Sequence, residues 1–360
     1  IGEASFFSKL VYFKNLLLLP LFYFFGRQIK LEITHWRKAY KVLFGLILCT
    51  AIVAVMEKFM GVHLHTLIDW SRYQLEVYDN EVGGVFGIGF TFEAQGGKPR
   101  YGAFFAHPLE LSASMLLPVA LSVYLLLNVR FRENKVKYLI FLGGSLLCVL
   151  LAYSRATFVA FFIMLIYMAF LLRYYKILFS AFIGAVAFTI YVFYFASEDL
   201  RYFVIDTITF QNSSSITHLI DWAEAIESMI SNPLGIGLAT SGNINGMEEE
   251  LTVGGENQFL IFGVQMGVIG MLLYMFIYYL AIRDSVKAYR MAESKETSVI
   301  PFVAASVKVG LLLPLFTANV EAYLFIALVS WWLVGYSETQ YRKVILEKRK
   351  NQIKMKTSFA

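Results

Sequence analysis

Charged residues are scarce in this chain. Lys, Arg, Asp and Glu make up 16% of its 360 residues, whereas 58% are hydrophobic and the mean hydropathy is +0.62. A soluble domain of this size cannot bury so much apolar surface, so lipid is the natural solvent. Unpaired backbone polar groups are not tolerated in lipid, and we therefore expect a helical bundle. The apolar runs are continuous and do not alternate with polar residues, which disfavours an outer-membrane barrel.

Cysteine is equally rare. Cys49 and Cys148 both sit inside apolar runs, so we interpret them as packing residues and not as a redox or metal pair. His63 and His65 lack the spacing and the third ligand that a zinc site needs. The sequence contains no nucleotide-binding loop, no GxGxxG and no nucleic-acid motif, and we expect no nucleic-acid partner.

The apolar runs predict an all-α polytopic transmembrane bundle with about nine spans. We find no internal repeat and no boundary to a soluble domain, so residues 1–360 are interpreted as a single transmembrane domain. The predicted spans are Ser5–Phe25, Val42–Met56, Leu109–Val129, Tyr138–Ala152, Phe158–Leu172, Ile177–Phe195, Asn257–Ile282, Val299–Thr317 and Ala322–Tyr336.

Lys and Arg crowd into alternate polar intervals along the chain. The positive-inside rule places these intervals, with the C-terminal tail, in the cytoplasm. Two long intervals then face outward: the first outer loop, 57–108, and the second outer loop, 196–256. Nine spans leave Ile1 outside, and because the chain begins with Ile rather than Met, we expect further spans upstream.

The two outer loops differ in pattern. The first is glycine-rich, with a short strand pair expected around Val85–Phe92, and it ends at Pro108, which fits the first turn of a helix. In the second, apolar residues recur at helical spacing from Leu219 to Ile230. They predict an amphipathic helix that lies on the membrane surface or caps the bundle, and Asn232-Pro233 ends it. A polar interval this long is either a working site or a connector.

Arginines on the outer side are candidates to hold an anion, because the planar guanidinium donates two hydrogen bonds at once. Arg155 lies in a very short turn between two apolar runs, where a cation is costly unless it is paired, used, or able to snorkel to the headgroups. Arg100 and Arg201 are further candidates. Arg72 is more simply a solvated loop residue.

Glu256-Asn257 opens the seventh span. Glu256 is either a helix cap or a general base whose pKa is raised in a partly dry site. His218 and His107 could act as bases near neutral pH. Lys308 lies inside the eighth span and needs a partner there. Glu321 is an unlikely direct partner, because a continuous helix would hold it about three and a half turns away.

Four motifs together resemble the O-antigen polymerase and O-antigen ligase superfamily of bacterial membrane glycosyltransferases, which implies a GT-C-like fold. They cover roughly Arg100 to Tyr279. The motifs are Arg100-Tyr101-Gly102 with His107-Pro108, Ser154-Arg155, His218–Trp222 with Asn232-Pro233-Leu234-Gly235-Ile236-Gly237, and Glu256-Asn257 with Leu260, Gly263, Gly267 and Gly270.

The resemblance implies a membrane glycosyltransferase in the bacterial inner membrane, with its active face outward. The donor would be a glycan on undecaprenyl pyrophosphate and the acceptor a glycan or lipid-linked glycan, with a chain-length regulator as a further partner and no nucleotide sugar, metal or other cofactor. Glu256 is the expected base and His218 the second choice. Arg155, Arg100 and Arg201 would bind pyrophosphate. Asn257, His107 and Trp222 would make other substrate contacts.

The alternatives come from different classes. The ligase branch usually has His where this chain has Glu256, and many members have Arg where it has His218. Glu256 therefore favours a polymerase over a ligase that transfers glycan to lipid A core or another acceptor. A flippase or transporter should line many spans with polar residues, whereas these spans are mostly apolar apart from Lys308. A channel is the weakest alternative, since no filter-like motif occurs.

Overall fold

The computed structural model describes residues 4–29, 33–78, 80–94, 97–128, 135–195, 213–242 and 252–358, with 198, 201 and 205 as isolated residues. Parts of the second outer loop therefore lie outside the described residues. Apart from two short strands, the regular elements of these described residues are helices. They are α1 (Phe6–Gln28), α2 (Ile33–Met60), α3 (Leu64–Leu67), α4 (Trp70–Tyr78), η1 (Phe90–Phe92), α5 (Pro108–Ser114), α6 (Leu116–Leu127), α7 (Lys135–Leu151), α8 (Arg155–Leu171), α9 (Tyr175–Tyr194), α11 (Ser213–Ser231), α12 (Gln258–Met291), α13 (Val299–Gly310), α14 (Leu312–Thr317), η4 (Val320–Ala322) and α15 (Leu324–Ser358).

The predicted all-α membrane fold is confirmed. Each of the nine predicted apolar runs falls on a helix or on two consecutive helices. Within the described residues, five stretches are long and apolar enough to cross a membrane. These stretches are Phe6–Gln28, Lys38–Met60, Pro108–Leu127, Gln258–Met291 and Val299–Thr317, and α8 is a shorter apolar helix.

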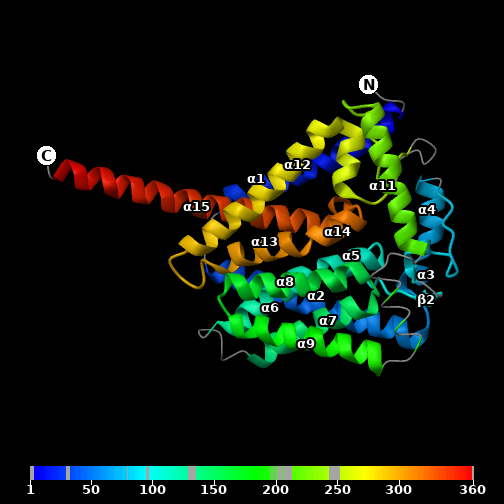
Figure 1. The fold of residues 1–360 in the computed structure, drawn as a ribbon, viewed down its shortest axis with the longest axis horizontal. Coiled ribbons are helices and arrows are strands. Elements are labelled where there is room, and N and C mark those ends of the chain that lie inside the picture. The colour runs from blue at the N-terminus through cyan, green and yellow to red at the C-terminus, as the bar shows by residue number, and fades with distance from the viewer. Residues whose placement is uncertain are drawn as a thin grey trace.

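The helices lie in two groups with their axes roughly side by side (Figure 1). In one group α1 packs along α15, and α12 packs against α13 and α15. In the other α7 packs against α2 and α6, and α8 against α9. Helix α13 joins the groups, because it contacts α6 and α8 as well as α12 and α15. The end of α15 projects beyond both groups (Figure 1).

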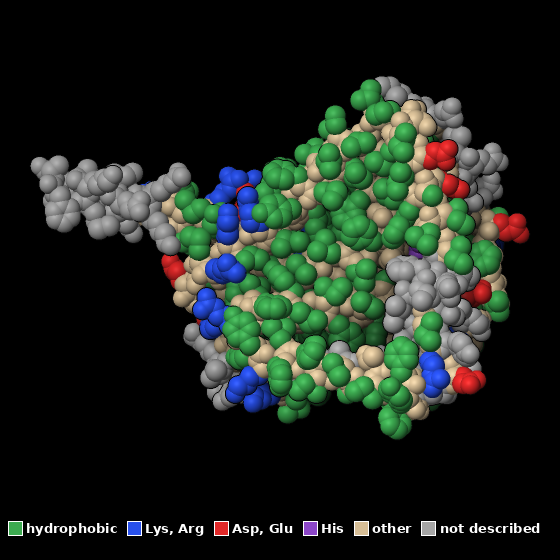
Figure 2. Space-filling view, in the orientation of Figure 1, with side chains coloured by type: hydrophobic (Ala, Val, Ile, Leu, Met, Phe, Trp, Pro, Cys, Tyr) green, Lys and Arg blue, Asp and Glu red, His purple; other side chains and the backbone are tan. Residues whose placement is uncertain are grey.

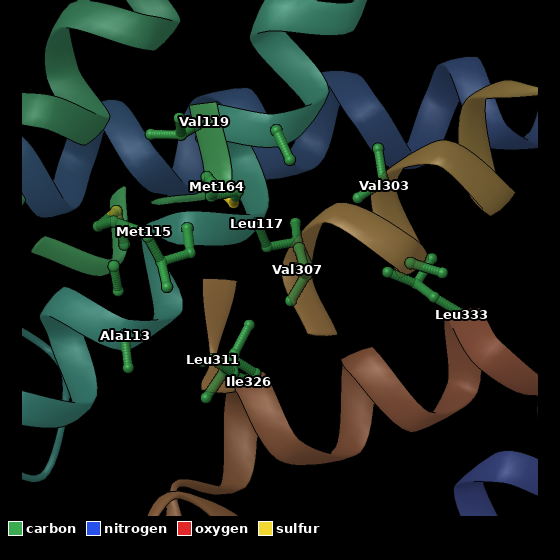
Figure 3. Close-up of a cluster of buried hydrophobic side chains, with 14 of the residues drawn as sticks. Ala113, Met115, Leu117, Val119, Met164, Val303, Val307, Leu311, Ile326 and Leu333 are labelled. Atoms are coloured by element: carbon green, nitrogen blue, oxygen red, sulfur yellow. The ribbon is translucent and has the colours of Figure 1, made fainter. Parts of the chain in front are cut away.

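The core lies where α13 meets its neighbours. Met115 and Leu117, Met164 of α8, Val307 of α13 and Ile326 of α15 converge there (Figure 3), and each is at most 4% exposed. Side chains from four separate parts of the chain therefore fill one apolar layer, which fixes the two groups of helices against each other.

The surface is divided along the helix axes. In Figure 2, Lys and Arg side chains gather mainly at one end, Asp and Glu side chains mostly at the other, and hydrophobic side chains cover the region between. Arg27 at the end of α1 and Arg342 in α15 both reach Glu338, with Nε–carboxylate distances of 4.0 and 2.7 Å. An apolar belt between charged ends is the surface expected of a protein that spans a bilayer.

The predicted strand pair in the first outer loop was wrong in position. The strands are β1 (Glu93–Ala94) and β2 (Lys98–Pro99), paired antiparallel with Glu93 opposite Pro99. Residues 85–92 form turns and η1 instead. Glycines at positive φ, such as Gly87 at 65° and Gly89 at 116°, interrupt any extended strand there.

The amphipathic helix of the second outer loop is confirmed as α11. It runs across the ends of the longer helices and not parallel to them (Figure 1). Ala225 and Met229 are buried against α12, whereas Leu219, Ile226 and Ile230 are exposed. Helix α11 thus caps the bundle with one face and presents apolar side chains outward with another.

The expectation that Glu321 is an unlikely direct partner of Lys308 was wrong. It assumed one continuous helix, but α13 ends at Gly310, α14 follows, and the backbone is extended at Ala318. The chain then turns back through η4. This return brings the Glu321 carboxylate to 4.0 Å from Lys308 Nζ, and both side chains are buried.

Candidate functional site

Arg155 occupies the first position of α8. Ser154 precedes it as the N-cap, with its Oγ accepting from the Thr157 N–H at 3.4 Å. Thr157 Oγ1 is in turn 3.0 Å from Ser112 Oγ of α5, so the start of α8 is fixed against its neighbour. The N-terminus of a helix carries partial positive charge, and Arg155 adds a full charge to it. This end of α8 is therefore suited to an anion.

Arg100 is brought to the same place by the first outer loop. The Tyr101 N–H donates to the Leu151 carbonyl at the end of α7 (3.2 Å), only a few residues before Arg155. Glu57, buried near the end of α2, accepts from the Ala103 N–H at 3.0 Å. Burial lowers the pKa of Arg100, and the neighbouring charge of Arg155 lowers it further, whereas Glu256 raises it. An arginine stays charged despite such shifts, so two cations face one another here.

Glu256 lies just before α12 and is not its cap. The Asn257 Oδ1 accepts from the N–H groups of Phe259 (3.0 Å) and Leu260 (3.3 Å), which makes Asn257 the N-cap. Of the alternatives that the sequence left open, the cap is thus assigned to the neighbouring residue. The Glu256 carboxylate is half-buried and lies close enough to Arg100 for the two charges to interact.

Asp221 of α11 stands beside Glu256. The backbone of Gly255 packs so closely on α11 that a Cβ there would overlap the Asp221 carboxylate. Three residues earlier on the helix, His218 lies close enough to Asp221 and Arg155 to feel both charges. Residues at i and i+3 share a helix face, and α11 therefore turns His218 and Asp221 together toward the arginines and Glu256.

The pKa of Glu256 is raised to about 7. Burial is the main cause, the Asp221 charge raises it further, and Arg100 opposes both. Burial also lowers the pKa of His218, with Asp221 raising it and Arg155 lowering it. A carboxyl group that titrates near neutral pH can both accept and return a proton, which is the property required of a general base.

His107 and Tyr323 form another wall of the site. His107 caps α5: its Nδ1 accepts from the Glu110 N–H at 3.2 Å, and its ring meets the Tyr323 ring edge-on at 4.9 Å. Burial lowers the pKa of His107 to about 4, so it is neutral at physiological pH. Tyr323, which follows η4, is buried and lies near the charges of Arg100 and Glu256.

The Asn-Pro-Leu-Gly-Ile-Gly run, residues 232–237, packs against α12, the helix that begins just after Glu256. It inserts into a break in α12 at Gly267, where φ is 75° and a Cβ would overlap the Pro233 carbonyl. The Ile236 N–H donates to the Val264 carbonyl (2.9 Å), and the Val268 N–H donates to Pro233 (3.2 Å). The loop thereby satisfies backbone groups that the break leaves free, and it locks α11 to α12.

The structure therefore brings together four of the predicted site residues, Arg100, Arg155, His218 and Glu256. Their cluster is called the rim site below. Trp222 lies one turn after His218 on α11. Arg72 pairs with Glu76 at 2.7 Å on the surface, as expected of a solvated loop residue. Arg201 belongs to a segment of which only scattered residues are described, and its role stays a prediction.

Two further site residues, Asp221 and Tyr323, were not singled out from the sequence. The spacing of three residues after His218 was the available signal for Asp221. Tyr323 had none, because it comes from the far end of the chain. Among the described residues, no group of three or more His, Cys, Asp or Glu side chains is placed to hold a metal ion.

Comparison with known proteins gives a match that covers much of the candidate site. The family model described as O-antigen ligase matches residues 139–275, which include Arg155, His218, Asp221 and Glu256. Arg100 and Tyr323 lie outside the match. No curated protein matches the chain. The match agrees with the resemblance seen in the motifs and supports the O-antigen polymerase and O-antigen ligase superfamily for residues 139–275.

Proposed function

We propose that this protein polymerises oligosaccharide repeat units carried on undecaprenyl pyrophosphate, to build a surface polysaccharide such as O-antigen, capsule or exopolysaccharide. The observation that carries the proposal is the rim site itself. Arg100 lies close to both Arg155 and Glu256, and the pKa of Glu256 is raised to about 7. Such a site offers cations for a leaving anion and a base for an attacking hydroxyl.

The arginines suit the leaving group. A pyrophosphate diester carries its negative charge at the level of the lipid headgroups, and Arg155 stands at a helix end that lies next to an apolar span. The charge of Arg155 lowers the pKa of Arg100, so the two cations repel each other. Bidentate guanidinium–phosphate hydrogen bonds would relieve that repulsion and hold the reacting carbon in place.

Glu256 suits the attacking group. In the proposed step an acceptor hydroxyl attacks the anomeric carbon of the donor sugar, and a new glycosidic C–O bond forms. The bond from that carbon to the pyrophosphate oxygen breaks, and its electron pair leaves with undecaprenyl pyrophosphate. The hydroxyl proton passes to Glu256. The charge of Asp221 raises the proton affinity of that carboxylate, and the charge of Arg100 lowers it.

The distribution of charge supports an outward-facing site in the inner membrane. Lys and Arg gather at one end of the molecule (Figure 2), and α12 begins beside Glu256 but ends near the basic residues Lys287 and Arg290. The positive-inside rule would place the basic end and the C-terminus in the cytoplasm and the rim site on the periplasmic or extracellular side.

An apolar cavity supports a lipid-linked donor. It measures about 350 Å³ and is lined by side chains of α2, α6, α13 and α15, from Phe325 to Tyr40 and Val299. Phe325 also lies beside the first turn of α5, because its N–H donates to Glu110 (3.5 Å), three residues after His107. A prenyl or acyl chain could pack in this cavity while its headgroup stays at the rim.

A ligase is the second candidate, since the matched family model is described by that activity. Glu256, in place of the histidine usual in the ligase branch, favours the polymerase. Deleting the gene and analysing the surface glycan separates the two. Single repeats attached to the acceptor are expected for a lost polymerase. Long chains that accumulate on the lipid carrier would instead identify a ligase, and repeats retained on the cytoplasmic side would identify a flippase.

A further inference from the structure

A buried ion pair lies inside the bundle, away from the arginines. Lys308 of α13 is 1% exposed, and its Nζ is 4.0 Å from the Oε1 of Glu321, which lies in η4. Ionisable side chains inside a membrane protein are costly unless they are paired, and they commonly serve function. This pair lies outside the family match at residues 139–275.

Both charges have specific partners. The Lys308 Nζ sits 3.7 Å from the centroid of a Trp331 ring, a cation–π contact. Trp331 Nε1 donates to the Glu321 carboxylate at 3.0 Å, and the Tyr274 hydroxyl donates to it at 2.5 Å. The network joins α12, α13, α15 and η4. Because a buried pair seldom stabilises a fold more than apolar side chains would, stability alone does not explain it.

The backbone of η4 connects this pair to the rim site in two ways. The Glu321 N–H donates to the Gln258 Oε1 at 3.1 Å, and Gln258 is the first residue of α12, two positions after Glu256. Two residues after Glu321, Tyr323 packs against His107 and lies near Arg100 and Glu256. The anchored carboxylate of Glu321 thus holds both the start of α12 and the Tyr323 wall.

We infer that the Lys308–Glu321 ion pair is a positioning element of the rim site, which fixes Glu256 and Tyr323 relative to the two arginines. The inference rests on the proposed function, since it concerns the geometry of that reaction. Neither side chain touches the rim-site charges directly, so both act through Gln258, η4 and Tyr323. Moving a base by about 1 Å can cost about 100-fold in rate, so loss of this positioning should lower the reaction rate measurably.

The test is a double variant, Lys308→Met with Glu321→Gln, which removes both charges and leaves neither one unpaired. The glutamine still offers an oxygen to Tyr274 and Trp331. We expect near-normal amounts of folded protein in the membrane, but a kcat lowered at least about 10-fold with a nearly unchanged KM for the donor. The donor is the lipid-linked glycan extracted from cells that lack the gene. A matched control is Arg72→Gln with Glu76→Gln, which removes an exposed ion pair.

An infrared titration makes the result independent of turnover. The carboxyl band that Glu256→Gln abolishes should titrate near pH 7 in the wild type and at a different pH in the double variant. A folded double variant with wild-type kcat and an unchanged titration would overturn the inference. If the wild type fails to act on the extracted donor while the titration still differs between the wild type and the double variant, the proposed function is wrong. The positioning role of the ion pair is then still supported.

A second variant tests the inference in case the double variant does not fold. If the double variant is not recovered from the membrane, Glu321→Asp keeps the charge but shortens the side chain, which pulls on η4. We expect it to be folded, with lowered kcat and a displaced titration. Wild-type behaviour of Glu321→Asp in both measurements would also contradict the inference.

Discussion

Replacing Glu256 with glutamine should abolish activity and yet stabilise the protein at alkaline pH. The folded state raises the pKa of Glu256 from 4.5 to about 7. Below about pH 4.5 the carboxyl group is protonated in both the folded and the unfolded chain, so it makes no difference to stability. Between pH 4.5 and 7 the unfolded chain ionises first, and the free energy of unfolding falls as the pH rises.

Above pH 7 the full difference is reached. It amounts to about 3 kcal/mol, at 1.36 kcal/mol for each pH unit between the two pKa values. Water reaching the half-buried carboxylate reduces it, so this is an upper value. Glutamine resembles the protonated acid at every pH and avoids the penalty. For a chain of 360 residues, 3 kcal/mol corresponds to a rise in Tm of about 4 °C.

Thermal unfolding of the purified protein in detergent, followed by tryptophan fluorescence, measures this directly. At pH 8 the Glu256→Gln variant should unfold at a higher temperature than the wild type, and at pH 5 the two should nearly coincide. Glu224→Gln is the matched control, because Glu224 is an exposed carboxylate on α11. An equal shift at both pH values, or a lower Tm at pH 8, would refute the assignment of a buried, charge-destabilised base.

Three further outcomes are expected. Initial rates should rise with pH through about 7, because Glu256 accepts a proton only when ionised. In Asp221→Asn the midpoint of this rise should move to lower pH, because the charge that raises the pKa of Glu256 is gone. An unmoved midpoint would show that Asp221 does not influence the base. Gly255→Ala should lose activity at normal membrane abundance, since the new Cβ overlaps Asp221, whereas Gly45→Ala, which meets nothing within 4 Å, should stay active. Gly267→Ala should destabilise by about 2 kcal/mol through strain at its positive φ, seen as a lower Tm; a wild-type Tm would mean that the break in α12 is unimportant.

The elements that composition controls were predictable. Each apolar run lies on a helix because lipid requires continuous backbone hydrogen bonding. The place of Pro108 in the first turn of α5 also followed a local rule. The helical spacing of apolar residues in α11 was enough to predict a helix. It did not predict which face of that helix would be buried.

Pairings between distant parts of the chain were not predictable. Lys308 and Glu321 meet because the helical path ends after α14, where Ala318 is extended, and the chain turns back through η4. Gly310 and Pro314 lie in the apolar run from Val299 to Thr317, but they do not predict the direction in which the chain returns. Tyr323 reaches the rim site through the same turn. The strand pair shifted to Glu93–Ala94 and Lys98–Pro99 because glycine conformation, and not side-chain pattern, decides where the first outer loop extends.

The site could be predicted in part, through residue type. Arg100 and Arg155 stood out because cations are rare on the predicted outer side, and Glu256 because it opens the seventh predicted span. Their closeness depends on a backbone contact between Tyr101 and Leu151, which the sequence does not encode in any local pattern.

The most direct test of the central claim is the length distribution of the surface glycan in cells that carry Arg155→Ala or Glu256→Gln as the sole copy. With Arg72→Ala as the control for an exposed arginine, both variants should be present in the membrane at normal levels and should yield only single repeats on the acceptor. Glycan chains of normal length in either variant would contradict the claim that the rim site performs the transfer.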